Sequence, residues 1–580
     1  MTSFIIENFV PIMFLSVIVV LLTGFPVAFG LAAVGLVFGV VGISLDLFPT
    51  TLFQVLPLRI FGIMQNETML AIPFFTLMGI VLERSGIAED LLETMGQLFG
   101  AINGGLAISV ILVGALLAAS TGVTSAVVIS MGLISLPVML RYGYKKEIAA
   151  GVITASGAMV QSLPPSIVLI VMADQLGRSV GDMYAASIGP GLLLIAVYIV
   201  FIIGVSLVAP STVPALPEHA RIQGTKQGTS GRRSLVMLLI GCCAIGLLWG
   251  AFHDDVMAQM VSQPAQAAPS SHVLIMAMVI SSLFALSFAG VNRMAGLSML
   301  SPLAERFVFA LIPPVFLIFL VLGTIFLGIA TPTEGGAMGA LGAILLAMGR
   351  RRLTLKILVQ ALGSASQLAI FVMFILIGST VFSFTFSAAD GNLWVEHLFV
   401  GLPGGELGFV IAVVAIIFVL GMFLDFYEIA FIVIPLLVPV ANSLGVDLIW
   451  FGIVIALVLQ TSFLTPPFGF ALLYLRSVAP KKDYTDSVTK EPISGVPTKS
   501  IWKGSAYFVV LQLVIVAIVI SFPTLVTGNL DTSGGLSDDE IMRQLNNQMA
   551  PMQEDDSLRN PFEVEAEDGG DPMAALLKSM

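Results

Sequence analysis

The chain has 580 residues, of which 57% are hydrophobic and only 11% are charged. A soluble domain carries roughly 25% charged residues, so this composition, with a mean hydropathy of +1.02, excludes a soluble globular protein. It indicates an integral membrane protein with many spans. The net charge of −11 lies mainly in a tail, 531–580, which holds 12 acidic and three basic residues. We expect this tail to be disordered, because it has few large apolar residues.

The rarer residues exclude several kinds of site. Cys242 and Cys243 are adjacent within an apolar run, so neither a disulfide framework nor a Cys-rich metal site is available. No Gly-x-x-x-x-Gly-Lys-Ser/Thr motif is present, so the chain has no P-loop with which to hydrolyse ATP. We also expect no nucleic-acid partner and no cleavable signal peptide, since the first apolar run is too long for one.

Apolar runs long enough to span or half-span a bilayer follow one another along the chain. They are predicted near 9–43, 67–83, 104–140, 146–172, 184–209, 234–252, 272–290, 307–349, 366–388, 408–441, 448–475 and 504–526. The first run contains Gly24-Phe25-Pro26 and is interpreted as either one span or two. Residues 45–62 and 353–365 have amphipathic patterns that favour helices along the membrane interface.

Lysine and arginine gather in four loops, which the positive-inside rule places in the cytoplasm. These loops contain Arg141, Lys145 and Lys146; Arg221, Lys226, Arg232 and Arg233; Arg350, Arg351, Arg352 and Lys356; and Arg476, Lys481 and Lys482. The loops 253–271 and 389–407 contain acidic but no basic residues, so they are predicted to face outward. Alternation of sides then also places the acidic tail outside.

A shift of 302 residues lays 112–166 over 414–468 without a gap and indicates an internal repeat. The matches include every proline of the first copy, and helix-breaking positions are what a structural repeat must keep. The identical pairs are Pro137/Pro439, Val138/Val440, Gly143/Gly445, Val152/Val454, Ile153/Ile455, Pro164/Pro466 and Pro165/Pro467.

Each copy begins with an apolar run of about 35 residues, which is too long for one span of roughly 20 residues. Polar segments interrupt these runs at 120–125 and 421–428. We interpret both runs as re-entrant hairpins whose legs reach about the midplane and whose tips carry the polar residues. The first enters from the cytoplasm and the second from outside, as inverted repeats require.

About 40 residues after each tip, a spanning run contains two successive prolines, Pro164-Pro165 in one copy and Pro466-Pro467 in the other. Two prolines remove two backbone donors and clash with the preceding turn, so each helix is predicted to unwind there. The freed carbonyls need partners at membrane depth, which Ser/Thr hydroxyls and a bound cation can supply. The alternative is a pair of Pro-kinked helices whose hydroxyls satisfy only their own backbone.

Two carboxylates are candidate site residues, and each has an alternative interpretation. Asp425 would need a partner or a cation if it lies at the midplane, and otherwise it lies at the interface. Glu334, in the segment Ala330-Thr331-Pro332-Thr333-Glu334, is either a charge stabilised by a helix N-terminus or an ion or contact residue.

Taken together, the Thr331-Pro332-Thr333-Glu334 segment, the Pro164-Pro165-Ser166 segment and the Leu424-Asp425 region before Pro435 and Pro439 resemble motifs of one family. It is the large membrane subunit of tripartite ATP-independent periplasmic (TRAP) transporters. The resemblance covers most of 1–526 and is closest to a longer subgroup often labelled for mannitol or chloroaromatic compounds, which is also associated with 2-oxo acids and lactate-like monocarboxylates. The polar loop and two extra spans at 211–290, and the tail, depart from the shorter members.

The resemblance implies an all-α, elevator-type secondary transporter in the bacterial inner membrane, driven by sodium (Na+). It implies as partners a small membrane subunit, a periplasmic substrate-binding protein and an organic acid substrate. The implied parts are N-terminal spans (1–103), a first transport repeat (104–210), the insertion (211–290), scaffold and arm helices (291–407), a second transport repeat (408–476), a cytoplasmic loop with the last span (477–530) and the tail (531–580).

Carried over position by position, the family places sodium at each tip and break, with substrate between the tips. The implied residues are Ser120, Thr121, Thr124, Ser125, Ser156 and Ser162 in the first site and Gly421, Asp425, Thr461, Ser462 and Thr465 in the second. Further contact candidates are Ser166, Thr331, Thr333 and Glu334.

Other functions were weighed against this one. A stand-alone ion or dicarboxylate transporter with similar hairpins would need no binding protein. A membrane-embedded enzyme would need a catalytic motif that is absent from the sequence, and all four histidines, at 219, 253, 272 and 397, lie in or beside loops. A channel would not show saturable, sodium-dependent uptake.

Overall fold

The computed structural model describes residues 2–220, 231–261, 270–296, 299–486 and 488–528. The predicted disordered tail and the first part of the second basic loop lie outside these residues. The described chain consists of helices, turns and one short β-hairpin, which confirms the predicted all-α polytopic fold. Nine described helices are long and apolar enough to cross a membrane, and a bent pair, Leu52–Met64 with Glu67–Arg84, can make a tenth crossing.

The first apolar run forms two helices that pack against each other. The chain turns between them at Gly24, whose φ of +75° is accessible to glycine without strain. The elements of this half are α1 (Thr2–Glu7), α2 (Phe9–Leu22), α3 (Val27–Ser44), η1 (Leu52–Gln54), α4 (Leu56–Met64), η2 (Glu67–Leu70), α5 (Ala71–Arg84), α6 (Ile87–Phe99), α7 (Gly105–Thr121), α8 (Thr124–Arg141), α9 (Lys146–Ala158), η3 (Met159–Gln161), α10 (Ile167–Leu176), α11 (Val180–Val208), η4 (Pro210–Thr212) and η5 (Glu218–Ala220).

The second half begins with the two helices of the insertion and repeats the order of hairpin and broken helix. Its elements are α12 (Gly231–Val261), α13 (Ser270–Ala295), α14 (Pro302–Phe326), α15 (Pro332–Gly349), α16 (Leu355–Ala388), α17 (Gly391–Val400), α18 (Gly405–Leu420), α19 (Phe426–Glu428), the π-helical turn η6 (Ile429–Val433), α20 (Ile434–Ser443), α21 (Leu448–Phe463), α22 (Phe470–Val478), the antiparallel strands β1 (Tyr484–Thr485) and β2 (Pro492–Ile493), α23 (Thr498–Ser521) and α24 (Thr524–Thr527).

Three local predictions need correction. Residues 353–365 do not form a separate interfacial helix, because α16 runs unbroken for 34 residues from its cap at Thr354, about 50 Å at 1.5 Å per residue. The predicted outer loop 389–407 contains α17. The hairpin legs α7 and α8 have 17 and 18 residues; at about 26 Å they are longer than the half-span expected for a core of roughly 30 Å.

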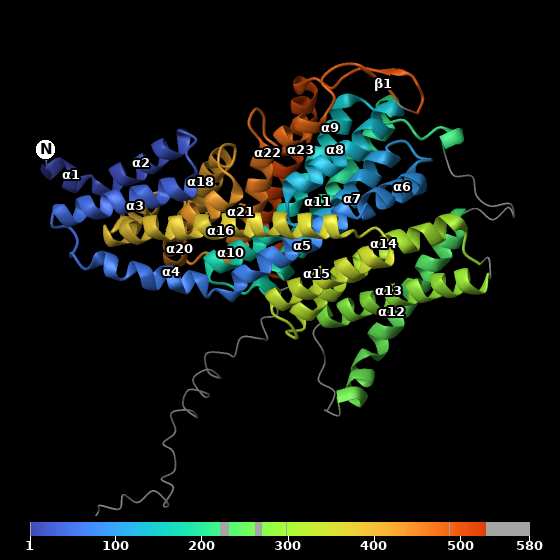
Figure 1. Cartoon of the computed structure of the whole chain (residues 1–580), viewed down its shortest axis with the longest axis horizontal. Helices are drawn as coiled ribbons and strands as arrows, with labels where there is room; N and C mark the ends of the chain where they lie inside the picture. The colour runs from blue at the N-terminus through green and yellow to red at the C-terminus, as the bar shows by residue number, and fades with distance from the viewer. Residues whose placement is uncertain (1, 221–230, 262–269, 297–298, 487, 529–580) are drawn as a thin grey trace, which may run out of the picture. The chain divides into compact units, whose positions relative to one another are not determined.

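The broken helices form the interior of the protein. Every residue from 148 to 173 and from 450 to 464 is buried, as expected of segments that are apolar on all sides. The long helix α16 lies along α3 and also contacts α5, which packs along α15 (Figure 1). We call α3, α5, α15 and α16 the scaffold helices.

Contacts between distant loops agree with the predicted orientation. Arg141 pairs with Asp486 through Nε–Oδ2 and Nη2–Oδ1, each 2.9 Å, and so joins the first and fourth basic loops. The Arg141 guanidinium holds the pKa of the Asp486 carboxyl well below its usual range, so this carboxylate stays ionised. A second long-range contact joins the start of η2 to the end of α10, where Asn66 Nδ2 donates to Asp174 Oδ1 (2.7 Å).

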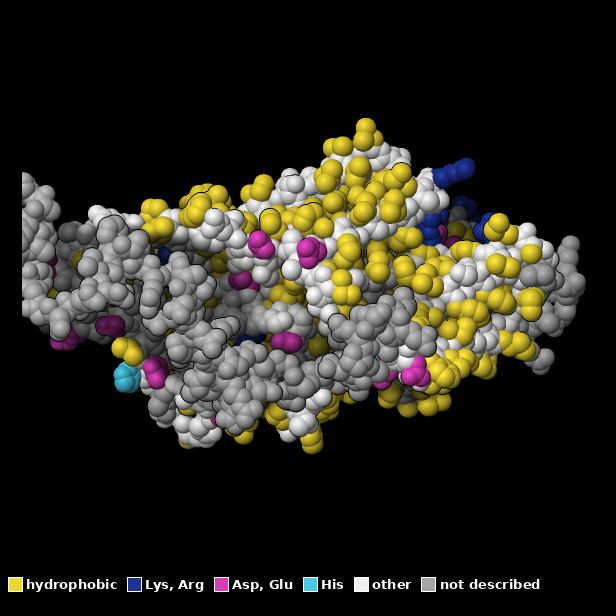
Figure 2. Space-filling view, turned by 90° about the horizontal axis from the view of Figure 1, so that it is seen from below, with side chains coloured by type: hydrophobic (Ala, Val, Ile, Leu, Met, Phe, Trp, Pro, Cys, Tyr) yellow, Lys and Arg dark blue, Asp and Glu magenta, His cyan; other side chains and the backbone are white. Residues whose placement is uncertain are grey.

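The exposed surface is that of a membrane protein. Figure 2 shows hydrophobic side chains over most of the visible described surface, whereas Lys and Arg gather mainly towards its right-hand end. Such wide apolar exposure would be rare on a soluble monomer.

Candidate functional site

Both Pro-Pro segments interrupt their helices, as the sequence predicts. The first break covers 162–166, between η3 and α10, and Ser166 caps α10 by accepting from Val168 N at 3.2 Å. The second covers 464–469, between α21 and α22. Backbone groups freed at these positions need partners other than their own helix.

Each hairpin tip packs against the broken helix of its own repeat. A Cβ on Gly122, where φ is +65°, would lie 2.8 Å from Ile167 Cγ1. A Cβ on Gly421 would lie 2.9 Å from Ser462 Cβ. A Cβ at either position would force Ile167 or Ser462 to shift, so these two glycines suit the close tip-to-break contact.

The two repeats meet through a buried hydrogen bond between their broken helices. Ser162 Oγ donates to Gln460 Oε1 at 2.6 Å, and both residues are fully enclosed. The Oε1 of Gln161 and the Nε2 of Gln460 have no hydrogen-bond partner. The two breaks therefore belong to one polar centre with unused hydrogen-bonding capacity, in which water or an ion could be held.

Apart from Ser162, the hydroxyls predicted for the two cation sites divide into two groups. Several donate to carbonyls of their own helices at 2.8–3.1 Å, as the Pro-kink alternative expects, although each oxygen keeps lone pairs for a cation. These are Ser120, Thr121, Thr461, Ser462 and Thr465, of which Ser462 also donates to the carbonyl of Phe418 in the hairpin leg α18 at 3.0 Å. Ser156 Oγ is buried without a partner, and the hydroxyls of Thr124 and Ser125 form no hydrogen bond with the described part of the chain.

Asp425 lies at the second tip, after a leg of 16 residues that is about 24 Å long, which disfavours an interfacial position on the side where the leg begins. It is the N-cap of α19: Asp425 Oδ1 accepts from Phe426 N at 2.8 Å, and Glu428 Oε2 accepts from Asp425 N at 3.1 Å. The helix N-terminus therefore offsets part of the burial of this carboxylate. The Asp-x-x-Glu spacing is a capping-box signal that our sequence analysis missed.

Thr331 and Glu334 form a second capping box, at the start of α15. Thr331 N donates to Glu334 Oε2 at 2.8 Å, and Thr333 Oγ1 donates to the carbonyl of Glu67 at 2.6 Å. Of the two interpretations of Glu334, the structure favours a charge at a helix N-terminus. The structure joins these residues to η2 and does not bring them to the tips.

A cavity of about 300 Å³ adjoins the first tip. It lies between Thr121, Val123 and Ser125 of the tip and the scaffold helices α5 and α16. Glu83 and Arg84 of α5 line it, and Arg84 Nη1 donates to Gln360 Oε1 of α16 at 2.9 Å. The only sequence signal for these two charged residues is their place at the end of an apolar run, which does not distinguish them from other loop residues.

The same scaffold helix, α16, borders the cavity at the first tip and contacts the second tip. Ser364 and Leu368 face the first-tip cavity, and Phe371 stacks edge-on against Tyr427 of the second tip, with ring centroids 6.1 Å apart. The first-tip cavity and the second tip therefore lie at neighbouring turns of one helix.

Comparison with known proteins identifies the family. The family model for the DctM component of the tripartite ATP-independent periplasmic transporter matches residues 14–525. The chain belongs to this family. It is therefore a multi-pass inner-membrane subunit of a TRAP transporter and not an enzyme.

This chain aligns with several known proteins over most of their length. The C4-dicarboxylate TRAP transporter large permease protein DctM of Pseudomonas aeruginosa is 26% identical over 75% of this chain and 83% of its own. The sialic acid TRAP large permease SiaM of Vibrio cholerae is 23% identical, with 87% and 94% covered. The ectoine TRAP large permease TeaC of Halomonas elongata is 24% identical, with 88% and 96% covered. Among solved structures, the Alcanivorax borkumensis YdaH transporter matches with a TM-score of 0.46 at 11% identity, covering 81% of this chain and 88% of that one.

The hydrogen bond between the repeats gives a stability prediction. Ser162→Ala should lower the free energy of unfolding by about 1–3 kcal/mol, because it leaves the buried Gln460 carbonyl without a donor. Ser120→Ala should have a smaller effect, since the Ser120 hydroxyl serves only its own helix. Thermal unfolding of the purified variants measures both. Equal losses in the two variants would contradict a special role for the contact between the breaks.

Proposed function

We propose that this chain imports an organic acid across the bacterial inner membrane with the energy of a sodium gradient. The substrate arrives on a periplasmic binding protein, and a small membrane subunit completes the transporter. The name of the family supports these partners, since it describes a tripartite, ATP-independent periplasmic system. The substrates named for the relatives, C4-dicarboxylates and sialic acid, support a carboxylate as the substrate class.

The observation that carries the proposal is the packing of each hairpin tip on its own helix break, with the two breaks joined by Ser162 and Gln460. This arrangement concentrates hydroxyl and carbonyl oxygens in a buried interior, and such oxygens can replace the hydration shell of a hard monovalent cation. No cluster of three or more His, Cys, Asp or Glu residues suited to a transition metal exists among the described residues.

The substrate anion would bind between the tips, against α16. Helix α10 begins at the first break, and its N-terminus favours a carboxylate, whereas the N-terminus of α19 is already capped by Asp425. Arg84 at the first-tip cavity adds a guanidinium that can hold a carboxylate through two hydrogen bonds. The acids Asp425 and Glu428 at the second tip would repel such an anion unless a cation lies between them.

Transport then requires the tips and breaks to move past the scaffold helices as one body, in an elevator-type motion. The shared burial of α9, α10 and α21 supports such a unit. A close contact with the scaffold lies at Gly79 of α5, where an added Cβ would be 2.2 Å from Thr121 Cα. A small residue at this contact suits a surface along which the first tip slides.

The proposal predicts sodium-driven uptake. Proteoliposomes containing both membrane subunits, with the binding protein outside, should accumulate substrate only with an inward sodium gradient and should ignore ATP. Radiolabelled substrate offered with each candidate acid measures this. Undiminished uptake in potassium-only buffer would contradict sodium coupling, and uptake without the binding protein would support a stand-alone transporter.

Asp425→Asn tests the charge at the second tip. Asparagine is also a good N-cap, so we expect normal insertion and thermal stability but at least a tenfold loss of sodium-dependent uptake, about 1.4 kcal/mol, together with weaker dependence on sodium.

The matched control is Glu334→Gln, which neutralises a carboxylate in the other capping box. This variant should keep uptake within about twofold, since glutamine can also occupy that position of the box. Uptake by Asp425→Asn within twofold of wild type, about 0.4 kcal/mol, at unchanged sodium dependence would exclude a role for its charge.

A further inference from the structure

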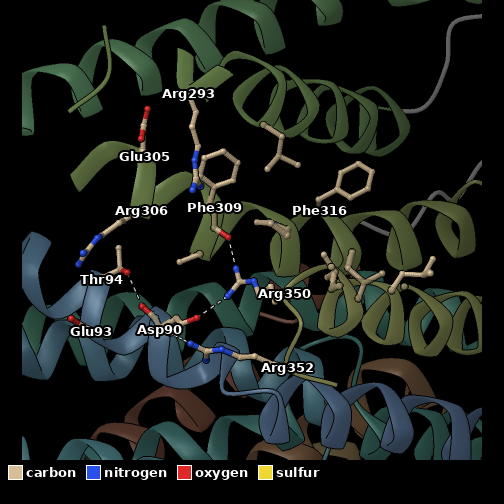
Figure 3. A pocket seen from close by; sticks show the side chains of 18 of the residues that line it. Asp90, Glu93, Thr94, Arg293, Glu305, Arg306, Phe309, Phe316, Arg350 and Arg352 are labelled. Carbon is tan, nitrogen blue, oxygen red and sulfur yellow. Dashed lines mark hydrogen bonds and ion pairs between the residues drawn. The ribbon is translucent and has the colours of Figure 1, made fainter. Parts of the chain in front are cut away.

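A second cavity, of about 1350 Å³, lies away from the tips and breaks. It is bounded by α6, α13, α14 and α15, so one wall comes from the insertion that distinguishes this chain from shorter members of the family (Figure 3). One end is charged and the rest is apolar, lined by Phe316, Leu317, Leu320, Leu345 and others.

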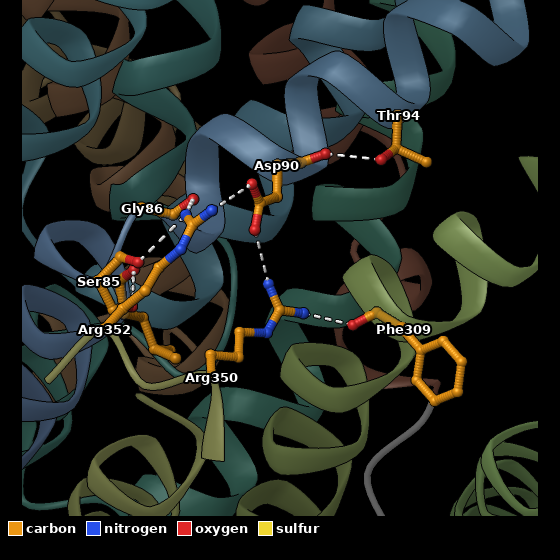
Figure 4. A network of polar contacts seen from close by, with 8 residues as sticks. Ser85, Gly86, Asp90, Thr94, Phe309, Arg350 and Arg352 are labelled. Atoms are coloured by element: carbon orange, nitrogen blue, oxygen red, sulfur yellow. Dashed lines mark hydrogen bonds and ion pairs between the residues drawn. The ribbon is translucent and has the colours of Figure 1, made fainter. Parts of the chain in front are cut away.

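The charged end contains four arginines and three carboxylates, and the arginines are not equivalent. Arg350 and Arg352 both bind Asp90, at 3.0 and 3.1 Å, and Arg350 also donates to the carbonyl of Phe309 (Figure 4). These two guanidiniums are therefore occupied, and they fix the ends of α6 and α15 to each other.

Arg293 and Arg306 form no ion pair with any residue in the described ranges. Arg293 lies over the ring of Phe309, with 5.7 Å from its Cζ to the ring centroid. Of the remaining acids, Glu305 accepts from Asn292 Nδ2 at 2.6 Å, and Glu93 lies on the rim. Two arginines thus stay available for an anion at the mouth of an apolar cavity.

The part of the cavity from Arg306 to its apolar end is about as long as one leaflet of a bilayer is deep. The lining on α14 runs from Pro302 to Leu320, and from Arg306 to Leu320 is 14 residues, about 21 Å along the helix. Half of a bilayer of 40–45 Å, including its headgroup region, is about 21 Å. The charged end lies beside the basic loop 350–356, so this leaflet is the cytoplasmic one.

We propose that this cavity binds an anionic phospholipid of the cytoplasmic leaflet, with its phosphate at Arg293 and Arg306 and an acyl chain along the apolar wall. A transmembrane helix of a partner would need a groove through both leaflets, whereas this one ends after about one. A free phosphate would need no apolar wall. Basic pockets between helices on this side of a membrane suit lipid headgroups.

The test is lipid binding to the full-length chain, measured by native mass spectrometry after exchange into phosphatidylcholine. Wild type should retain phosphatidylglycerol in preference to phosphatidylcholine, and Arg293→Ala/Arg306→Ala should weaken that binding about 30-fold. Lys356→Ala/Lys503→Ala, which removes two exposed positive charges outside the cavity, should bind as wild type does. Leu345→Trp, which fills the apolar wall while keeping every charge, should also weaken binding.

Three results would overturn the proposal. Equal retention of phosphatidylcholine would remove the role of the arginines. Competition by glycerol 3-phosphate at the same concentration as the lipid would indicate a site for free phosphates. Release of the lipid on addition of the small membrane subunit would make the cavity a protein interface. Because size-exclusion chromatography and circular dichroism report whether each variant is folded, loss of binding in a folded variant is decisive.

Discussion

The architecture depends on one constraint: backbone carbonyls at the two Pro-Pro breaks have no hydrogen-bond donor within their own helix and need other partners. Two prolines in succession end the helical hydrogen bonding of α9 and α21 at a depth where water is scarce. The hairpin tips cover these breaks, and the absence of a Cβ at Gly122 and Gly421 allows them to approach Ile167 and Ser462 without displacing them. The need for hydrogen-bonding partners at the breaks thus fixes where the tips lie, and the tips in turn bring hydroxyls and one carboxylate to the interior.

The two halves are equivalent in architecture and different in chemistry. The first tip carries hydroxyls and adjoins a cavity with Glu83 and Arg84, whereas the second carries Asp425 and Glu428 in a capping box. The hydrogen bond between Ser162 and Gln460 connects the two halves, and the Nε2 of Gln460 has no hydrogen-bond partner. A cation bound at one break could therefore influence the other break through this single hydrogen bond, which offers a physical route for coupling between two sites.

Much of the fold could be predicted because helix breaks have local sequence signals, namely prolines, glycines and polar residues inside apolar runs. The repeat, both hairpins and both broken helices follow from such signals. Contacts between distant segments could not be predicted this way: Arg141 and Asp486 are 345 positions apart, and Ser162 and Gln460 are 298 apart. The prediction of a separate interfacial helix at 353–365 is wrong because an amphipathic first part does not end a helix. Helix α16 contains neither a proline nor two successive glycines that would break it.

Hydrogen exchange of the purified chain in sodium, compared with equimolar potassium, tests the central claim most directly. If cations bind where tips meet breaks, sodium should slow amide exchange in peptides covering 120–126, 159–167, 421–429 and 460–469 and leave the basic loop 350–358 unchanged. Equal exchange in the two salts at all four segments, with sodium present well above the concentration that supports uptake, would contradict it.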